Sequence, residues 1–157
     1  MITFQVSDVW RNTYPAAHAG VLVVRNVANP AHHAELEVRK AALEEQLRSQ
    51  FAGQDRSALL RNPILQAYDS YYKQFKKTYH VQLQLESILF KGKSIPTVAA
   101  LVETMFMAEM NGLLLTAGHD LDALQLPLTL DVAKGTESYI QLAKELLDHE
   151  QTAGQSA

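Results

Sequence analysis

The sequence predicts a mixed fold, α/β or α+β, in which strands flank a helical middle. Three patterns carry this prediction. Ile2, Phe4 and Val6 alternate with polar residues near the start of the chain, as in a half-buried strand. Residues 31–75 carry leucines and aromatic residues at helical spacing. Residues 126–133 alternate again, so a further strand is expected late in the chain.

The length and composition predict one cytoplasmic domain. A chain of 157 residues fits a single domain, residues 1–157, with a small, polar tail expected to fray at about 151–157. The sequence has no cysteine, which excludes disulfides and thiolate catalysis and fits a reducing compartment. It has no apolar run long enough for a bilayer and no signal-peptide pattern at its start, so no membrane partner is expected.

The local patterns define the expected elements in chain order. A helical turn should follow Ser7 and Asp8, and the β-branched run 19–27 reads as a strand buried on both faces. Asn62-Pro63 has the residue order that favours a helix start. The other expected elements are a helix at 31–51, a short turn at 57–60, a helix at 83–89, a helix that begins near Ser94-Ile95-Pro96 and ends at Met110, extended residues at 113–115, and a strand or helix at 139–147.

Charge is distributed unevenly, although the net charge is only −3. Residues 1–93 contain 12 Lys and Arg against 8 Asp and Glu, whereas the remainder contains 2 against 9. A basic first part can bind a polyanion. The candidate nucleic-acid-binding residues are the lysines Lys73, Lys76, Lys77, Lys91 and Lys93, the last two in a Lys-Gly-Lys-Ser sequence that has the residue types of an anion-binding turn.

Aromatic and basic residues interleave between residues 68 and 80. Such aromatic side chains can stack on unpaired bases while the lysines meet phosphates. The same spacing also suits a helix that packs its aromatic face into a core, and we prefer this second interpretation for Tyr68, Tyr72 and Phe75.

Polar residues follow the apolar helix that ends at Met110. His119, Asp120 and Asp122 could act as an acid/base group, or they could cap nearby backbone N–H groups. The adjacent His32 and His33 offer metal donors, but a solvated helix entry fits them better, and we expect no metal and no cofactor.

Several motifs occur in a fixed order along residues 20–142: Glu86-Ser87-Ile88-Leu89, Lys91-Gly92-Lys93, Ile95-Pro96, Leu101-Val102-Glu103, Thr116-Ala117-Gly118, Asp120-Leu121-Asp122 and Leu128-Thr129-Leu130-Asp131-Val132-Ala133. Together they resemble the B3/B4 domain of the phenylalanyl-tRNA synthetase β subunit, and more closely its free-standing relatives. The resemblance implies a three-layer domain with a mixed sheet flanked by helices. In the synthetase, this domain holds the editing pocket where tyrosine wrongly attached to phenylalanine tRNA is hydrolysed.

The resemblance also implies a set of site residues. The glycine turn and acidic motif of the pocket correspond to Gly118, Asp120 and Asp122, and the pocket alanine corresponds to Ala133. The family's pocket glutamate falls at Asn111, or at Glu109 if the alignment slips. Candidate catalytic residues are therefore His119, Asp120 and Glu109, and candidate substrate-binding residues are Asn111, Thr116, Ala117, Gly118, Asp122 and Ala133.

This chain departs from the family pattern at several positions. Asn111 replaces the pocket glutamate, which puts hydrolysis in doubt. In addition, Glu103 replaces the usual aspartate and His119 replaces an aromatic residue. Three functions stay open: a trans-acting deacylase of mischarged tRNA, a non-catalytic module that binds tRNA or another nucleic acid, and a pocket for a small ligand such as an amino acid. Compared with the relatives, a shortened member with an incomplete sheet is expected, and its open sheet edge would favour a homodimer.

Overall fold

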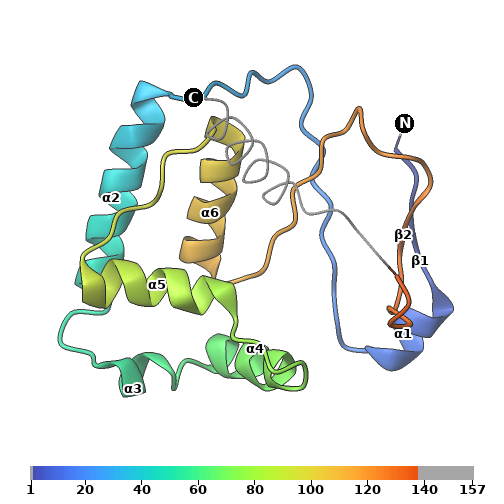
Figure 1. Ribbon diagram of the computed structural model, residues 1–157, viewed down its shortest axis with the longest axis horizontal. Coiled ribbons are helices and arrows are strands. Elements are labelled where there is room, and N and C mark those ends of the chain that lie inside the picture. The colour runs from blue at the N-terminus through green and yellow to red at the C-terminus, as the bar shows by residue number, and fades with distance from the viewer. Residues whose placement is uncertain (1, 138–157) are drawn as a thin grey trace, which may run out of the picture. The chain divides into compact units, whose positions relative to one another are not determined.

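The computed structural model describes residues 2–137, which form two compact units. The described part of the first unit is residues 2–21 and 121–137, and the second unit is residues 22–120. The described chain is mostly helical and has a two-stranded parallel sheet, so it is a mixed α and β structure, as the sequence predicts (Figure 1). Within residues 2–137, no helix is both long and apolar enough to cross a bilayer.

The first unit contains the sheet and one short helix. Strand β1 (Phe4–Val6) pairs in parallel with β2 (Leu128–Leu130), with Phe4 opposite Leu128 and Val6 opposite Leu130. Helix α1 (Asp8–Thr13) begins directly after β1 because the Ser7 Oγ accepts a hydrogen bond of 3.0 Å from the N–H of Trp10. The same hydroxyl donates to the carboxylate of Asp131, so one side chain connects the ends of both strands.

The second unit is helical. Its helices are α2 (Ala34–Gln50), α3 (Arg56–Leu59), α4 (Pro63–Lys73), α5 (His80–Lys91) and α6 (Ala100–Gly112). Helix α2 packs against both α5 and α6, and Figure 1 shows α5 crossing the ends of the other two. The core of this unit consists of buried aliphatic side chains around one buried tyrosine, namely Leu43, Leu47, Leu59, Leu65, Tyr79, Val81, Leu85, Ile88, Ile95, Met110 and Leu113.

The predicted helices form, and their ends follow local chemistry. The Oδ1 of Asn62 accepts the N–H of Ile64 at 2.9 Å, and Pro63 occupies the first turn of α4, so this predicted helix start is confirmed. Helix α3 is capped by Asp55. Helix α5 ends at Gly92, which adopts a left-handed conformation with φ of 63°.

The strand predicted at residues 19–27 is wrong. The structure has neither helix nor strand there, and Leu22 is 86% exposed. The β-branched composition favours an extended backbone, but a strand also needs a paired neighbour, and no other described segment pairs with this one. Residues 113–115 likewise form no strand, and the strand predicted at 126–133 is reduced to Leu128–Leu130.

The predicted start of the helix near Ser94 is also wrong, because α6 begins at Ala100. The N–H of Ile95 donates to the Oε1 of Glu44 at 2.7 Å, so this buried residue is fixed by a tertiary contact before the helix begins. The strand or helix predicted at 139–147 and the frayed tail predicted at 151–157 lie outside the described residues.

Candidate nucleic-acid interface

Helix α4 separates its aromatic side chains between two faces. Tyr68 and Tyr72 pack against the core of the second unit, as preferred from the sequence. The ring of Tyr68 stacks on the buried Tyr79 with centroids 4.1 Å apart and planes 10° apart, and Tyr72 lies 5.4 Å from the same ring. These contacts fix the orientation of α4, because both inward rings meet one fully buried side chain.

Tyr71 on the outward face of α4 and Phe75 in the turn directly after the helix form an exposed aromatic pair. Their side chains are 44% and 57% exposed, and the two rings contact each other at 5.3 Å with planes 62° apart. The preferred packing of Phe75 in the core is therefore wrong. The helical spacing that places Tyr68 and Tyr72 on the inward face does not extend to Phe75, because α4 ends at Lys73 and Phe75 lies in the turn beyond it.

Lys76 and Lys77 lie next to this exposed aromatic pair. The chain turns sharply after α4, with Lys76 at φ of 55° and the N–H of Lys77 donating to the carbonyl of Tyr72 at 3.1 Å. Both lysines are exposed, and neither forms an ion pair with a described residue. Lys73 differs, because its ammonium lies 2.6 Å from the carboxylate of Asp69. Two exposed cations beside two exposed rings are the components of a single-stranded nucleic-acid contact.

Lys91 and Lys93 lie at the other end of α5. The 12 residues of this helix correspond to a length of about 18 Å, so this group is separate from the one at the end of α4. Gly92 lies at the end of α5 and does not precede the start of a helix. The N–H of Lys93 donates to the carbonyl of Ser87 at 3.0 Å. The predicted anion-binding turn is therefore wrong, since the N–H groups of a helix start are not presented there.

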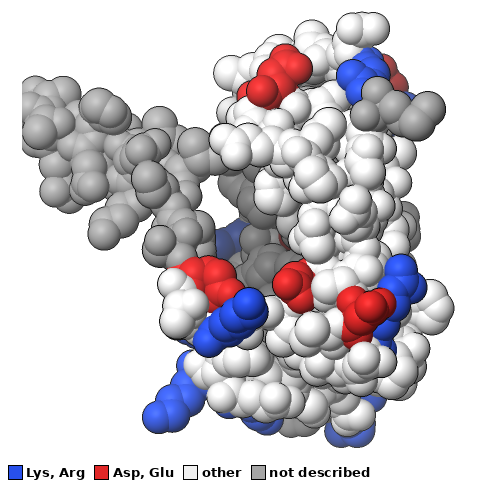
Figure 2. All heavy atoms as spheres, turned by 90° about the vertical axis from the view of Figure 1, so that its right-hand side faces the viewer, with Lys and Arg blue, Asp and Glu red and all other residues white. Residues whose placement is uncertain are grey.

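The charges are not gathered into a broad basic surface on the face shown in Figure 2. Basic side chains stand apart there, acidic ones lie near several of them, and most of the visible surface is uncharged. A contact with a nucleic acid on this face would accordingly be local.

Two of the predicted pocket residues, Glu109 and Thr116, are in direct contact. The Oε1 of Glu109 accepts both the N–H of Thr116 at 2.9 Å and its hydroxyl at 2.8 Å. The Oε2 of Glu109 lies 3.7 Å from the Nε2 of His80. Because the carboxylate is buried and already holds these groups, it fixes the segment after α6 to the helix and is not presented to an external substrate.

The other predicted site residues are exposed. Asn111 lies on the last turn of α6, and Ala117, Gly118, His119 and Asp120 follow in the loop after it. Gly118 lies close to α6: a Cβ atom there would fall 2.4 Å from the thioether sulfur of Met105, so the end of that flexible side chain would have to shift. Asp122 and Ala133 belong to the first unit, whereas Gly118 and Asp120 belong to the second.

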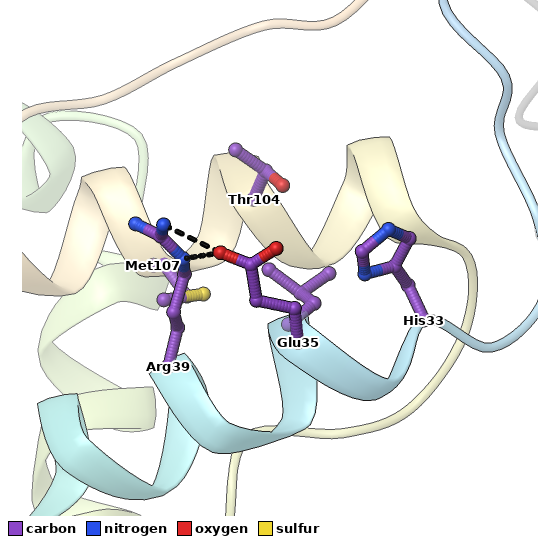
Figure 3. Close-up of a pocket in the computed structure, with 6 residues that line it drawn as sticks. His33, Glu35, Arg39, Thr104 and Met107 are labelled. Atoms are coloured by element: carbon purple, nitrogen blue, oxygen red, sulfur yellow. Dashed lines mark hydrogen bonds and ion pairs between the residues drawn. The ribbon is translucent and has the colours of Figure 1, made fainter.

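A shallow cavity of about 340 Å³ lies between α2 and α6 and was not predicted from the sequence. It is lined by His33, Glu35, Leu36, Arg39, Thr104 and Met107 (Figure 3). Glu35 and Arg39 form an i,i+4 ion pair at 2.7 Å across its edge, and this bond holds the pKa of Glu35 below its ordinary value. His32 lies at the start of α2 with its Nδ1 3.8 Å from Glu37, as expected for a solvated helix entry.

A buried ion pair connects α2 to α6. The ammonium of Lys40 lies 2.8 Å from the Oε2 of Glu103 and 2.7 Å from the Oε1 of Glu37, and it donates to the Thr97 hydroxyl at 3.0 Å. Glu103 is only 1% exposed, and its Oε1 accepts the N–H of Val98 at 2.8 Å. One cation therefore holds two helices and the loop before α6 in a single network.

The Glu103 contacts predict an acid-sensitive stability. Hydrogen bonds from Lys40 and from the N–H of Val98 hold the pKa of Glu103 below its ordinary value of 4.5. The resulting stabilisation is complete above that pH and is lost as the pH falls through the lowered pKa. We expect the free energy of unfolding, measured in urea, to fall more steeply with acid in the wild type than in Glu103→Gln, which cannot titrate. Equal slopes below pH 4.5 would contradict this assignment.

Comparisons with protein-family models, with curated proteins and with solved structures give no significant match to this chain.

Proposed function

We propose that this protein is a tRNA-associated binding module that contacts an unpaired segment of RNA through the end of α4. The observation that carries the proposal is the exposed pair of rings, Tyr71 and Phe75, followed by Lys76 and Lys77, which have no described acidic partner. Exposed rings can stack on bases of any sequence, and the lysines can contact the phosphates between them.

The choice of tRNA rests on the resemblance to the B3/B4 domain. The order of motifs from Glu86 to Ala133 supports a three-layer domain of this kind. The sheet of such a domain is larger than the pair formed by β1 and β2. The absence of cysteine supports a cytoplasmic location, where such an RNA is found.

Binding is favoured over hydrolysis because the carboxylate of Glu109, one of the residues expected to catalyse, is buried and already occupied. Glu109 is buried against Thr116, and His119 lies exposed in the loop after Gly118. A general base must lie within hydrogen-bond reach of the proton that it removes, and a buried, occupied carboxylate does not meet that requirement.

The experiment is a fluorescence anisotropy titration with an unacylated tRNA at several salt concentrations. We expect Tyr71→Ala and Phe75→Ala each to weaken binding by about 1–3 kcal/mol, because each removes a stacking surface. Lys76→Ala and Lys77→Ala should each weaken binding and make it less dependent on salt, with the slope falling by about 0.7 for each phosphate that is no longer neutralised.

Two matched variants serve as controls. Phe90→Ala removes an exposed ring from α5, and Lys91→Ala removes a cation at the end of the same helix, away from α4. Neither should weaken binding as the α4 variants do. No binding at low salt, or equal losses of affinity in the controls, would contradict the proposed interface. If the protein released an amino acid from mischarged tRNA and Asp120→Ala abolished that release, deacylation would replace binding as the function.

A further inference from the structure

The two exposed rings at the end of α4 are held at a steep angle to each other. The planes of Tyr71 and Phe75 are 62° apart, and their ring centroids are 5.3 Å apart. The ring of Tyr71 also meets that of Tyr72 edge-on, at 5.8 Å and 75°. Tyr72 in turn lies 5.4 Å from the ring of the fully buried Tyr79. A continuous series of ring contacts therefore connects the exposed pair to the core and holds its angle.

The angle between the rings determines how a bound strand must be arranged. A base that stacks on an aromatic side chain lies nearly parallel to its ring. Two neighbouring bases, one on Tyr71 and one on Phe75, would therefore be inclined to each other by about as much as the rings, which are 62° apart. Bases that stack on each other must also be nearly parallel, so these two bases cannot remain stacked. The exposed pair of rings thus accommodates a strand only where two neighbouring bases are unstacked.

We propose that this pair of rings selects single strands whose neighbouring bases stack weakly, and so binds uridine-rich RNA more tightly than adenosine-rich RNA. The inference rests on the proposed function and names the preferred substrate of the same site. Neighbouring adenines stack strongly, so each adenine that binds exchanges a base neighbour for a ring. Neighbouring uracils stack weakly, so each uracil gains a ring without losing a comparable contact. Preferences of this kind arise from stacking strength and not from hydrogen bonds to the edges of the bases.

The cations beside the rings should not contribute to this preference. Lys76 and Lys77 directly follow Phe75 and are exposed. Each nucleotide carries the same phosphate whatever its base, so these lysines attract both kinds of strand equally. The rings should therefore set the ratio of the two affinities, whereas the lysines raise both affinities together.

The test compares labelled oligo(U) and oligo(A), each of about ten nucleotides, by fluorescence anisotropy at the same salt concentration. We expect the wild type to bind oligo(U) about three to ten times more tightly than oligo(A). In Phe75→Ala one ring remains, and a stacked strand can place its end base on that ring without unstacking. This variant should therefore bind the two strands with affinities equal within about twofold.

Lys76→Ala is the matched control, because it should weaken the binding of both strands by the same factor and leave their ratio unchanged. Equal affinities of the wild type for the two strands, or tighter binding of oligo(A), would overturn the inference. The proposed function would still stand in that case if Phe75→Ala weakened the binding of both strands. A preference for oligo(U) that Phe75→Ala left unchanged would also overturn the inference, because the angle between the rings would then not be its cause. Binding of neither strand would overturn the inference together with the proposed interface.

Discussion

Replacing Lys40 with methionine is expected to lower the free energy of unfolding of the helical unit by about 3–5 kcal/mol at neutral pH. Methionine keeps the length of the side chain but removes the charge. Lys40 is the described group that faces the Oε2 of Glu103, at 2.8 Å, so the variant leaves a buried carboxylate oxygen without a partner. The destabilisation is that of an uncompensated buried charge, measured by urea unfolding followed by circular dichroism.

The pH dependence distinguishes this cause from a simple loss of packing. Burial alone would lower the pKa of Lys40, but its hydrogen bonds with Glu103 and Glu37 outweigh that effect and raise it, so the ammonium stays charged in the wild type. Without Lys40, burial raises the pKa of Glu103, and acid can neutralise it. The difference in stability between the wild type and Lys40→Met should therefore shrink as the pH falls from 7 toward 4.

The control for this prediction is the double variant Lys40→Met, Glu103→Met. Replacing both partners of a buried ion pair by apolar side chains is often nearly neutral. The double variant should accordingly recover much of the stability that Lys40→Met removes, but not all of it, because Glu103 also accepts the N–H of Val98. A double variant less stable than Lys40→Met would show that the ion pair is not the reason for the destabilisation.

The sequence predicts the elements whose causes are local. Asn62 and Pro63 specify the start of α4 through a capping side chain and a fixed φ, and the structure confirms both. The spacing of Tyr68 and Tyr72 places them on one helical face, and both pack inward. The same argument fails for Phe75, because α4 ends at Lys73 and Phe75 lies in the turn beyond the helix.

The sequence does not predict features that depend on distant residues. Lys40 and Glu103 are 63 positions apart, and nothing near either of them indicates a buried pair. The β-branched residues at 19–27 indicate an extended backbone, but a strand forms only when another segment pairs with it. Conversely, Ile95 was predicted to start a helix but lies before α6, because its N–H donates to the distant Glu44.

In the candidate site, too, the sequence predicts local features better than contacts between residues. Glu109 and Thr116 were both expected near the pocket, and the structure brings them together, but as a buried contact that closes the end of α6. His119 and Asp120 were expected beside them and lie in the exposed loop after Gly118. Residue types and their order predicted which side chains are near the end of α6. They did not predict which carboxylate would be occupied by a neighbouring hydroxyl and N–H group.

Replacing Tyr79 with alanine should lower the free energy of unfolding by about 3–5 kcal/mol, as expected for a large core aromatic residue. Tyr79 is fully buried, and its ring contacts those of both Tyr68 and Tyr72. Its hydroxyl donates to the carbonyl of Leu113 at 3.0 Å. The side chain therefore connects α4 to the residue that closes α6, and alanine would remove both the packing and the hydrogen bond. Urea unfolding measures the decrease.

Tyr79→Phe separates these two contributions. Phenylalanine retains the ring contacts but leaves the buried carbonyl of Leu113 without its donor, which should cost about 1–3 kcal/mol. Tyr14→Phe is the matched control, because the hydroxyl of Tyr14 makes no hydrogen bond to a described residue and its removal should change stability little. If Tyr79→Phe were as stable as the wild type, the hydrogen bond to Leu113 would not contribute to stability. Equal destabilisation by Tyr79→Phe and Tyr79→Ala would assign the whole effect to the hydroxyl, because the ring contacts of α4 with Tyr79 would then contribute nothing.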